Sequence, residues 1–255
     1  MSHTHISKAS EIDAATEKMY ERLAEFLVEQ FDISHVSIAL EAGSGGGQLT
    51  VPLVKKMSGI HKLIAYDSWT GPYGKDLSIL THAISREGLN DIVEIVKGNV
   101  RQTGFAEDKV DLIVSNELFC DLDRNSLKSA LREFRRILKS GGQMVHAELD
   151  PEAENRSQEL LIEADLHYSL ESLPFEGERW FSPTVEELQV LMHEAGFTDI
   201  NVGYFRTNFR LSYEAAIEQL KRWSIDMAFA KKYENDLMRY GLEFPKEHMI
   251  KCTKP

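Results

Sequence analysis

Short apolar stretches alternate along the chain with longer segments in which apolar residues recur at helical spacing. The short stretches predict strands at 36–40, 62–66, 92–96, 110–114, 143–149, 199–210 and 248–253. The longer segments predict helices at 10–31, 48–57, 75–87, 126–139, 155–173, 182–195 and 211–240. Strands that alternate with helices in this way are typical of an α/β fold with a doubly wound, mostly parallel sheet.

A cluster of glycines directly follows the first predicted strand. The chain reads E-A-G-S-G-G-G from Glu41 to Gly47, and the second predicted strand ends at Asp67. Glycine tolerates positive φ and lets the backbone approach a ligand closely, while a carboxylate can accept hydrogen bonds from ribose hydroxyls. The stretch therefore predicts a site for a nucleoside-like cofactor. It does not fit the dinucleotide pattern G-x-G-x-x-G, because the third glycine position falls on Gln48 or Thr50.

The pattern E-x-G-x-G-x-G resembles the first motif of class I S-adenosylmethionine (SAM)-dependent methyltransferases, a family with a Rossmann-like domain. Two later segments look like the same family: L-R-E-F-R-R-I-L-K-S-G-G-Q-M at 131–144 and S-P-T-V-E-E-L-Q-V-L-M-H-E-A-G-F-T-D-I at 182–200. The resemblance covers about residues 36–150, with a looser match beyond. It implies a seven-stranded sheet whose last strand is antiparallel, SAM as cofactor, and methyl transfer as the activity.

The resemblance also implies which residues hold SAM. They follow the carboxyl ends of the first four strands: Glu41, Gly43, Ser44, Gly45, Gly47, Asp67, Ser68, Trp69, Asn99, Val100 and Ser115. The ring of Trp69 either stacks on the adenine or anchors the core. Asn99 stands where the family usually has Asp, and its side-chain amide can still accept a hydrogen bond from the adenine amino group.

Methyl transfer needs a base only when the nucleophile is protonated, so the sequence need not show a catalytic residue. Glu117 is the best candidate by position, as a base or as a carboxylate that orients a cationic group. Candidates for substrate or cap contacts are Tyr20, Asn116, His146, His167, Tyr168 and Trp180. For His146, His167 and Tyr168 a structural or solvent-exposed role is the alternative. The histidines and Glu117 lack metal-ligand spacing, so we expect no metal site.

Composition restricts the class and the partners of the protein. With 42% hydrophobic and 27% charged residues, the chain is typical of a soluble globular protein. No apolar run is long enough to span a membrane, the start lacks a signal-peptide core, and there are 2 cysteines, so we expect a cytoplasmic protein. A net charge of −12 would repel naked nucleic acid.

We expect a single methyltransferase domain over 1–255, elaborated by an N-terminal cap helix at 10–31, an acidic cap insertion at 151–181 and a long C-terminal helix at 211–240. Between residues 151 and 195 the chain has eleven Asp or Glu and two Arg. These acids either form a solvated face or cover the cleft, where they would favour a cationic substrate or a basic partner. We expect the helix at 211–240 to be an insertion between the last two strands. In the alternative, the chain forms a hairpin near Gly203 and the helix is a C-terminal appendage.

The leading interpretation is a SAM-dependent methyltransferase that acts on a small molecule. A protein or RNA methyltransferase that works with a small basic subunit is an alternative, as is a non-catalytic relative that binds SAM. A homo-oligomer also fits the sequence. A nicotinamide oxidoreductase is disfavoured by the glycine spacing. The identity of the methyl acceptor cannot be derived from the sequence.

Overall fold

The computed structural model describes residues 8–70, 76–172, 183–223, 225 and 227–255, without the side chains of 8–11 and 167–172. The chain folds into two compact units, which we describe separately. The sheet unit comprises 21–148, 177–205 and 248–255. The helical unit comprises 1–20, 149–176 and 206–247. The expected elaborations are divided between these units: 10–20, 151–176 and 211–240 belong to the helical unit, and 21–31 and 177–181 to the sheet unit.

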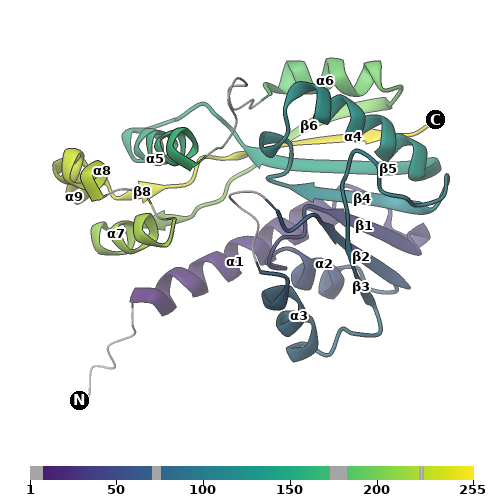
Figure 1. Ribbon diagram of the computed structural model, residues 1–255, viewed down its shortest axis with the longest axis horizontal. Coiled ribbons are helices and arrows are strands. Elements are labelled where there is room, and N and C mark those ends of the chain that lie inside the picture. Colours follow the sequence, from purple (N-terminus) through teal and green to yellow (C-terminus); the bar gives the residue numbers. More distant parts are fainter. Residues whose placement is uncertain (1–7, 71–75, 173–182, 224, 226) are drawn as a thin grey trace. The chain divides into compact units, whose positions relative to one another are not determined.

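The described part of the sheet unit is built on a seven-stranded sheet (Figure 1). Its strands are β1 (Ile38–Ala42), β2 (Lys62–Asp67), β3 (Val93–Lys97), β4 (Val110–Asn116), β5 (Leu138–Leu149), β6 (Thr198–Phe205) and β9 (Glu247–Thr253). Their order is β3-β2-β1-β4-β5-β9-β6. The pairs β2–β3, β1–β2, β1–β4 and β4–β5 are parallel, so the carboxyl ends of these strands meet at one edge.

The last strand runs against the others, as the resemblance implied. The amide of Gly141 donates to the carbonyl of Lys254 near the start of β5, and the amide of Asp150 donates to the carbonyl of Lys246 just beyond its end. Residue numbers therefore fall along β9 as they rise along β5, which makes the pair antiparallel. The predicted doubly wound fold with an antiparallel last strand is confirmed.

Helices cover both faces of this sheet. They are α1 (Lys8–Val28, which begins in the helical unit), α2 (Thr50–Lys56), α3 (Leu77–Arg86), α4 (Arg124–Ile137) and α6 (Val185–Glu194), with one-turn helices η1 (Ile33–His35) and η2 (Phe119–Asp121). Apolar residues of α4 and α6 pack on one face in a core cluster with Leu40, Ile113 and Met144. Asp123 caps α4 by accepting bonds from the amides of residues 125 and 126.

The helical unit contains α5 (Arg156–Ser172), α7 (Tyr213–Arg222), α8 (Met227–Lys232), α9 (Glu234–Tyr240) and an antiparallel pair of short strands, β7 (Arg210–Leu211) and β8 (Leu242–Glu243). The single helix predicted at 211–240 is thus wrong, since these residues form three helices in the part of the chain that is described. The amide of Ile225 donates back to Leu220 and that of Trp223 to Gln219, which ends α7 and buries the Ile225 side chain. The helices do lie between β6 and β9 in the chain, as we placed them.

The predicted strand at 199–210 is also divided. β6 ends at Phe205, and Asn208 adopts a φ of 50°, which an extended strand cannot contain. The hydroxyl of Thr207 donates to the carbonyl of Phe244, so the chain after β6 is held by the helical unit rather than by the sheet. The apolar alternation of 199–210 did not show this break.

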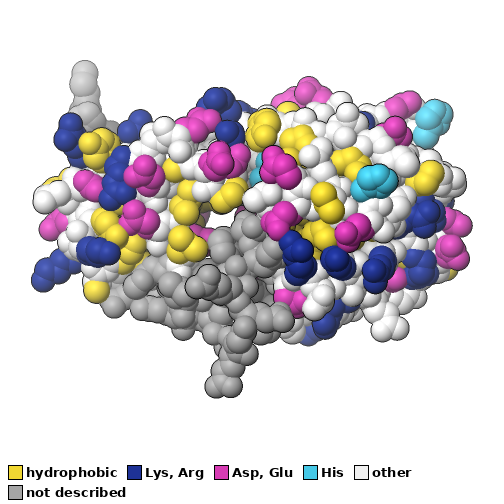
Figure 2. All heavy atoms as spheres, turned by 90° about the horizontal axis from the view of Figure 1, so that it is seen from above, with side chains coloured by type: hydrophobic (Ala, Val, Ile, Leu, Met, Phe, Trp, Pro, Cys, Tyr) yellow, Lys and Arg dark blue, Asp and Glu magenta, His cyan; other side chains and the backbone are white. Residues whose placement is uncertain are grey.

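Acidic and basic side chains are interspersed on the face of the molecule in Figure 2. Several acids of the predicted cap are paired within the helical unit. Arg156 lies 3.0 Å from both Glu159 and Glu163 and 2.7 Å from Asp236. Such pairs reduce the field that the predicted acidic cap would present to a cationic substrate. Among the described residues, no helix is both long and apolar enough to cross a lipid bilayer.

Candidate active site

The glycine loop joins β1 to α2 and is tied to the end of β2. The amides of Gly43 and Ser44 donate to the carbonyl of Tyr66 at 2.8 and 3.3 Å. Gly43 has a φ of 80°, and a Cβ there would lie 3.2 Å from Leu118. Gly45 has a φ of 50°, and a Cβ there would have no atom within 4 Å. The loop is therefore packed at its start and faces open space at Gly45, where we predicted a close approach to the cofactor.

Asp67 and Trp69 brace this loop. Asp67 accepts bonds from the amide of Gly45 at 2.8 Å and from the amide of Trp69 at 2.6 Å. The indole N–H of Trp69 donates to the carbonyl of Gly45 at 2.8 Å. Of the two roles considered for Trp69, the structure places its ring against the loop rather than in the core, and stacking on adenine stays a prediction. A carboxylate has about four acceptor sites, so Asp67 retains capacity for ribose hydroxyls.

Buried polar atoms without a partner gather at the glycine loop. Glu41 is 2% exposed, and its Oε2 atom has no hydrogen-bond partner among the described residues. The hydroxyl of Ser44 is also buried without a partner among the described residues, whereas the hydroxyl of Thr50 lies beside the Glu41 carboxyl. Burial raises the pKa of Glu41 to about 8; interaction with the Thr50 hydroxyl opposes this shift in part, and the charge of Asp67 adds to it. An unpaired buried polar atom is costly, so this cluster indicates a ligand that supplies donors and positive charge.

SAM fits these requirements. Its ammonium and sulfonium groups are positive, its ammonium and ribose hydroxyls are donors, and the loop offers two carboxylates and a free hydroxyl oxygen. Asn99 and Ser68 are already engaged locally. The side-chain oxygen of Asn99 accepts from the amide of Arg101 at 2.9 Å, and the hydroxyl of Ser68 accepts from the amide of Thr70 at 3.3 Å. The proposed adenine contact of Asn99 would have to share that oxygen.

The carboxyl ends of β4 and β5 carry a second group of candidates. Ser115 is the register partner of both Ala42 and His146, so its side chain lies beside the start of the glycine loop. Its hydroxyl lies 2.9 Å from His146 Nδ1, and His146 Nε2 lies 2.6 Å from Glu148. Sequence reasoning missed Glu148. The spacing His146-Ala147-Glu148 could have revealed it, because residues two apart on a strand share a face.

Asn116 is the last residue of β4, and Glu117 follows it. The side-chain amide of Asn116 and the backbone amide of Glu117 both donate to the carbonyl of Ala147 at 3.0 Å. Glu117 adopts a φ of 49°, which is uncommon for a residue other than glycine and is often found at functional sites. Its catalytic role stays a prediction.

The remaining candidates either belong to the helical unit or lie outside the described residues, so their roles stay predictions. Tyr20 is half-buried and belongs to the helical unit. His167 and Tyr168 lie on α5, but their side chains are outside the described residues, as is Trp180 altogether. Within the described residues, no group of three His, Cys, Asp or Glu side chains is arranged to hold a metal ion.

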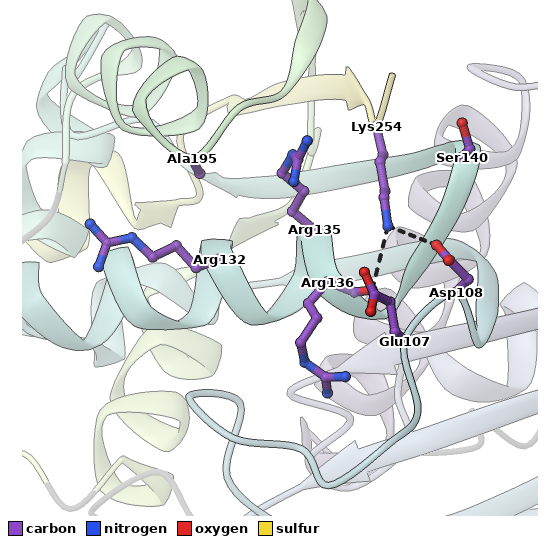
Figure 3. A pocket seen from close by; sticks show the side chains of 8 residues that line it. All are labelled: Glu107, Asp108, Arg132, Arg135, Arg136, Ser140, Ala195 and Lys254. Carbon is purple, nitrogen blue, oxygen red and sulfur yellow. Dashed lines mark hydrogen bonds and ion pairs between the residues drawn. The ribbon is translucent and has the colours of Figure 1, made fainter.

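A cavity of about 410 Å³ lies elsewhere, beside the start of β5 (Figure 3). It is lined by Glu107, Asp108, Arg132, Arg135, Arg136, Ser140, Ala195 and Lys254. Lys254 is bonded to Asp108 and to the carbonyl of Leu138, and the three arginines point in different directions in Figure 3. Its charged groups therefore do not converge on a ligand.

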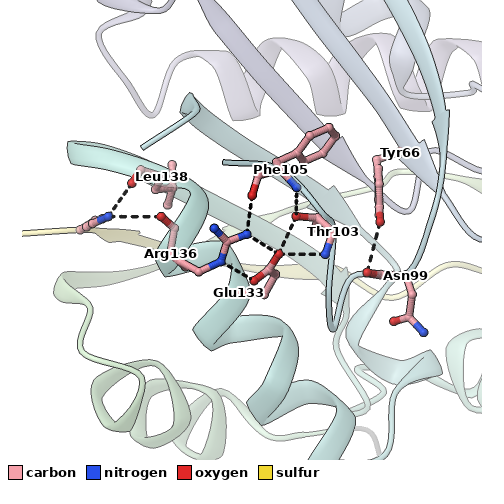
Figure 4. A network of polar contacts seen from close by, with 8 residues as sticks. Tyr66, Asn99, Thr103, Phe105, Glu133, Arg136 and Leu138 are labelled. Carbon is pink, nitrogen blue, oxygen red and sulfur yellow. Dashed lines mark hydrogen bonds and ion pairs between the residues drawn. The ribbon is translucent and has the colours of Figure 1, made fainter. Parts of the chain in front are cut away.

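A partly buried network supports the loop after β3 (Figure 4). Glu133 accepts from the amide of Thr103 at 2.8 Å and from its hydroxyl at 2.6 Å, and is paired with Arg136 at 2.8 Å. The hydrogen bond from Arg136, with those from Thr103, lowers the pKa of Glu133 to about 2. Close by, the hydroxyl of Tyr66 donates to the carbonyl of Asn99. The network fixes the segment that carries Asn99 and Val100.

Comparison with known proteins decides which family this site belongs to. Residues 40–146 match the sequence family described as "Methyltransferase domain", a span that begins at the end of β1 and reaches His146. These residues are a class I SAM-dependent methyltransferase domain. The methyltransferase is 29% identical over 165 residues to an uncharacterized methyltransferase from Geobacillus sp. (strain WCH70), covering 64% of this chain and 70% of that protein.

Solved structures agree on the fold. The YcgJ protein from Bacillus subtilis superposes with a TM-score of 0.67 at 13% identity, over 91% of this chain and 98% of that one. Phosphoethanolamine N-methyltransferase 2 from Haemonchus contortus, solved with phosphomonomethylethanolamine and S-adenosylhomocysteine, gives a TM-score of 0.62 at 13% identity, over 99% of this chain and 59% of that one. The match over residues 40–146 assigns SAM-dependent methyl transfer to that domain, and these solved structures show likeness of fold alone.

Proposed function

We propose that this methyltransferase acts on a small-molecule acceptor that enters a buried site at the carboxyl ends of β4 and β5. The observation that carries the proposal is the depth of the polar groups there. Ser115 and His146 are fully buried and Glu148 is 2% exposed. A small acceptor can be enclosed at such a depth, whereas a polymer lying on the surface would meet exposed groups.

Two further observations support a small acceptor. The net charge of −12 disfavours binding of a phosphate backbone. A protein of the same fold, from Haemonchus contortus, was solved with phosphomonomethylethanolamine, a small molecule. The likeness to that protein is one of fold, so the acceptor of the present enzyme is a separate question.

Different residues would hold the methyl donor and the methyl acceptor. Asp67 would accept bonds from the ribose hydroxyls, and Glu41 would face a positive group of SAM, which supplies an activated methyl. The glycine loop positions that donor, and the residues that follow β4 position the acceptor. Alignment of the two reactants and exclusion of water can supply much of the rate enhancement in such a displacement.

The test is incubation of the enzyme with a metabolite extract and SAM that carries an isotopically labelled methyl group. After ultrafiltration, mass spectrometry should find the label in a new small molecule. At limiting SAM, Asp67→Ala should lower the amount of product, whereas Glu94→Gln, which alters an exposed carboxylate on β3 that pairs with Lys62, should not. Label that accumulates only in added protein or RNA, or no transfer from any extract, would overturn the proposal.

A further inference from the structure

Three polar side chains form a buried chain across β4 and β5. The hydroxyl of Ser115 lies 2.9 Å from His146 Nδ1, and His146 Nε2 lies 2.6 Å from Glu148 Oε2. Ser115 and His146 are register partners on adjacent parallel strands, and Glu148 follows two residues later on the same face. Strand pairing therefore sets the geometry, which makes the arrangement rigid.

The contacts of His146 fix where its proton lies. A carboxylate at 2.6 Å is an acceptor, so Nε2 carries the hydrogen and Nδ1 offers a lone pair. Nδ1 then accepts the hydrogen of the Ser115 hydroxyl, and the oxygen of Ser115 keeps its lone pairs for another donor. The ring of Phe119 stacks on the imidazole, with 3.6 Å between ring centroids and 20° between planes, and holds its orientation.

The far end of the chain is the carboxylate of Glu148, which lies beside the thiol of Cys120. The Oε1 atom of Glu148 is buried and has no hydrogen-bond partner among the described residues. Cys120 is the neighbouring titratable group, and burial, with the charges of Glu148, Glu117 and Asp121, raises the pKa of its thiol well above the usual value. The thiol is therefore neutral, and Glu117 and Asp121 add negative potential.

We propose that Ser115, His146 and Glu148 form a proton relay that receives the proton that the methyl acceptor loses. The proposal rests on the proposed function, because it needs an acceptor at the end of β4. The acceptor donates its proton to the oxygen of Ser115, and the hydrogen of Ser115 passes to His146 Nδ1. The resulting imidazolium is paired with the carboxylate of Glu148.

The electrons balance in this step. The lone pair of the nucleophile forms the new bond to the methyl carbon, the carbon–sulfur bond breaks, and its electron pair remains on sulfur. The sulfonium charge is lost and one proton is gained by His146, which later releases it to solvent. The relay therefore specifies an acceptor whose nucleophile still carries a proton when it binds, such as a hydroxyl or an ammonium group. A nucleophile without a proton would gain nothing from it.

The first test reads the proton on His146 directly. In nitrogen NMR of histidine-labelled protein at neutral pH, His146 should be the neutral tautomer protonated at Nε2. Glu148→Gln should change the tautomer distribution, while His193→Gln, at an exposed site on α6, should only remove its own signals. A wild-type His146 protonated at Nδ1 alone would overturn the relay, because Ser115 could not then pass its hydrogen to the ring.

The second test measures transfer of labelled methyl to the metabolite extract across a pH series. Ser115→Ala and His146→Gln should lower the rate by about 100-fold at neutral pH, and the loss should shrink at high pH as acceptors ionise by themselves. SAM affinity of His146→Gln, measured by calorimetry, should stay within about twofold of the wild type. Ser115→Ala is the smaller change and serves if His146→Gln does not fold.

The two proposals fail differently. If wild-type enzyme transfers no label, the proposed function fails. If the wild type transfers label, and both variants have the same rate and pH profile as the wild type, the relay alone is wrong. A uniform loss at every pH, equal in both variants, would mark a purely structural role and would also overturn the relay.

Discussion

Glu41 should make the unliganded protein less stable as the pH rises. Its carboxyl group is buried at the end of β1, and its pKa is raised from 4.5 to about 8. Below pH 4.5 the group is protonated in both the folded and the unfolded chain. Above that value the unfolded chain loses the proton while the folded chain keeps it, so the free energy of unfolding falls by about 1.4 kcal/mol per pH unit.

Glu41→Gln removes this titration and keeps the size of the side chain. Between about pH 5 and about pH 8 the variant should gain about 4 kcal/mol of stability relative to the wild type. That is a large part of the stability of an ordinary domain, so the effect should be visible. Above about pH 8 the gap should stop widening, because Glu41 is then ionised in both states.

Urea denaturation followed by tryptophan fluorescence at a series of pH values measures this gap. Glu94→Gln is the matched control, because Glu94 is exposed on β3 and should show no pH-dependent difference. A constant difference between wild type and Glu41→Gln across the range would refute the reasoning. It would mean that Glu41 is ionised in the folded protein, and that an unseen partner compensates its buried charge.

Three further predictions concern the loop and its support. Asp67→Ala should weaken SAM binding at least tenfold, about 1.4 kcal/mol, by calorimetry, and an unchanged affinity would remove Asp67 from the site. Gly45→Val and Gly59→Val both place a side chain at positive φ in open space, so both should lose some thermal stability, but only Gly45→Val should abolish SAM binding. Equal SAM affinity of these two variants would place the cofactor elsewhere. Glu133→Gln should lower the free energy of unfolding by about 2 to 3 kcal/mol at neutral pH. This loss should disappear towards pH 2, because the lowered pKa of Glu133 is reached there. A loss in urea denaturation that does not depend on pH would argue against ionised Glu133 as its source.

The glycine loop could be predicted from the sequence because its determinants are local. Gly43 and Gly45 follow an apolar stretch directly, and Asp67 ends the next one. The structure confirms the strand, loop, helix and strand that these positions imply, and adds the bonds from Asp67 to the amides of Gly45 and Trp69. Those bonds depend on how two strand ends meet, which no local pattern encodes.

The relay shows what local patterns leave out. Ser115 and His146 were both candidates, but for different roles, because their contact arises from the register between β4 and β5. The spacing of His146 and Glu148 places both on one face of a strand, but a charged residue near the end of a strand is usually solvated. Spacing alone therefore indicates a shared face, and the burial of Glu148 is what marks it as a candidate.

The helix predicted at 211–240 failed for a related reason. Its apolar spacing continues through Trp223 and Met227, but α7 ends at Arg222, and the amide of Ile225 donates to the carbonyl of Leu220. The side chain of Ile225 is buried after the turn. An apolar residue fits the pattern of a continuing helix and of such a helix end equally well, so periodicity alone could not distinguish them.

The most direct test of the account is calorimetric titration of SAM into the protein at neutral pH, in buffers with different heats of ionisation. If the positive charge of SAM lies at Glu41, binding lowers the pKa of that carboxyl from about 8, and about one proton should leave the wild-type protein. Glu41→Gln should bind SAM without releasing that proton. An equal number of protons released by both proteins, or no binding of SAM by the wild type, would contradict the site described here.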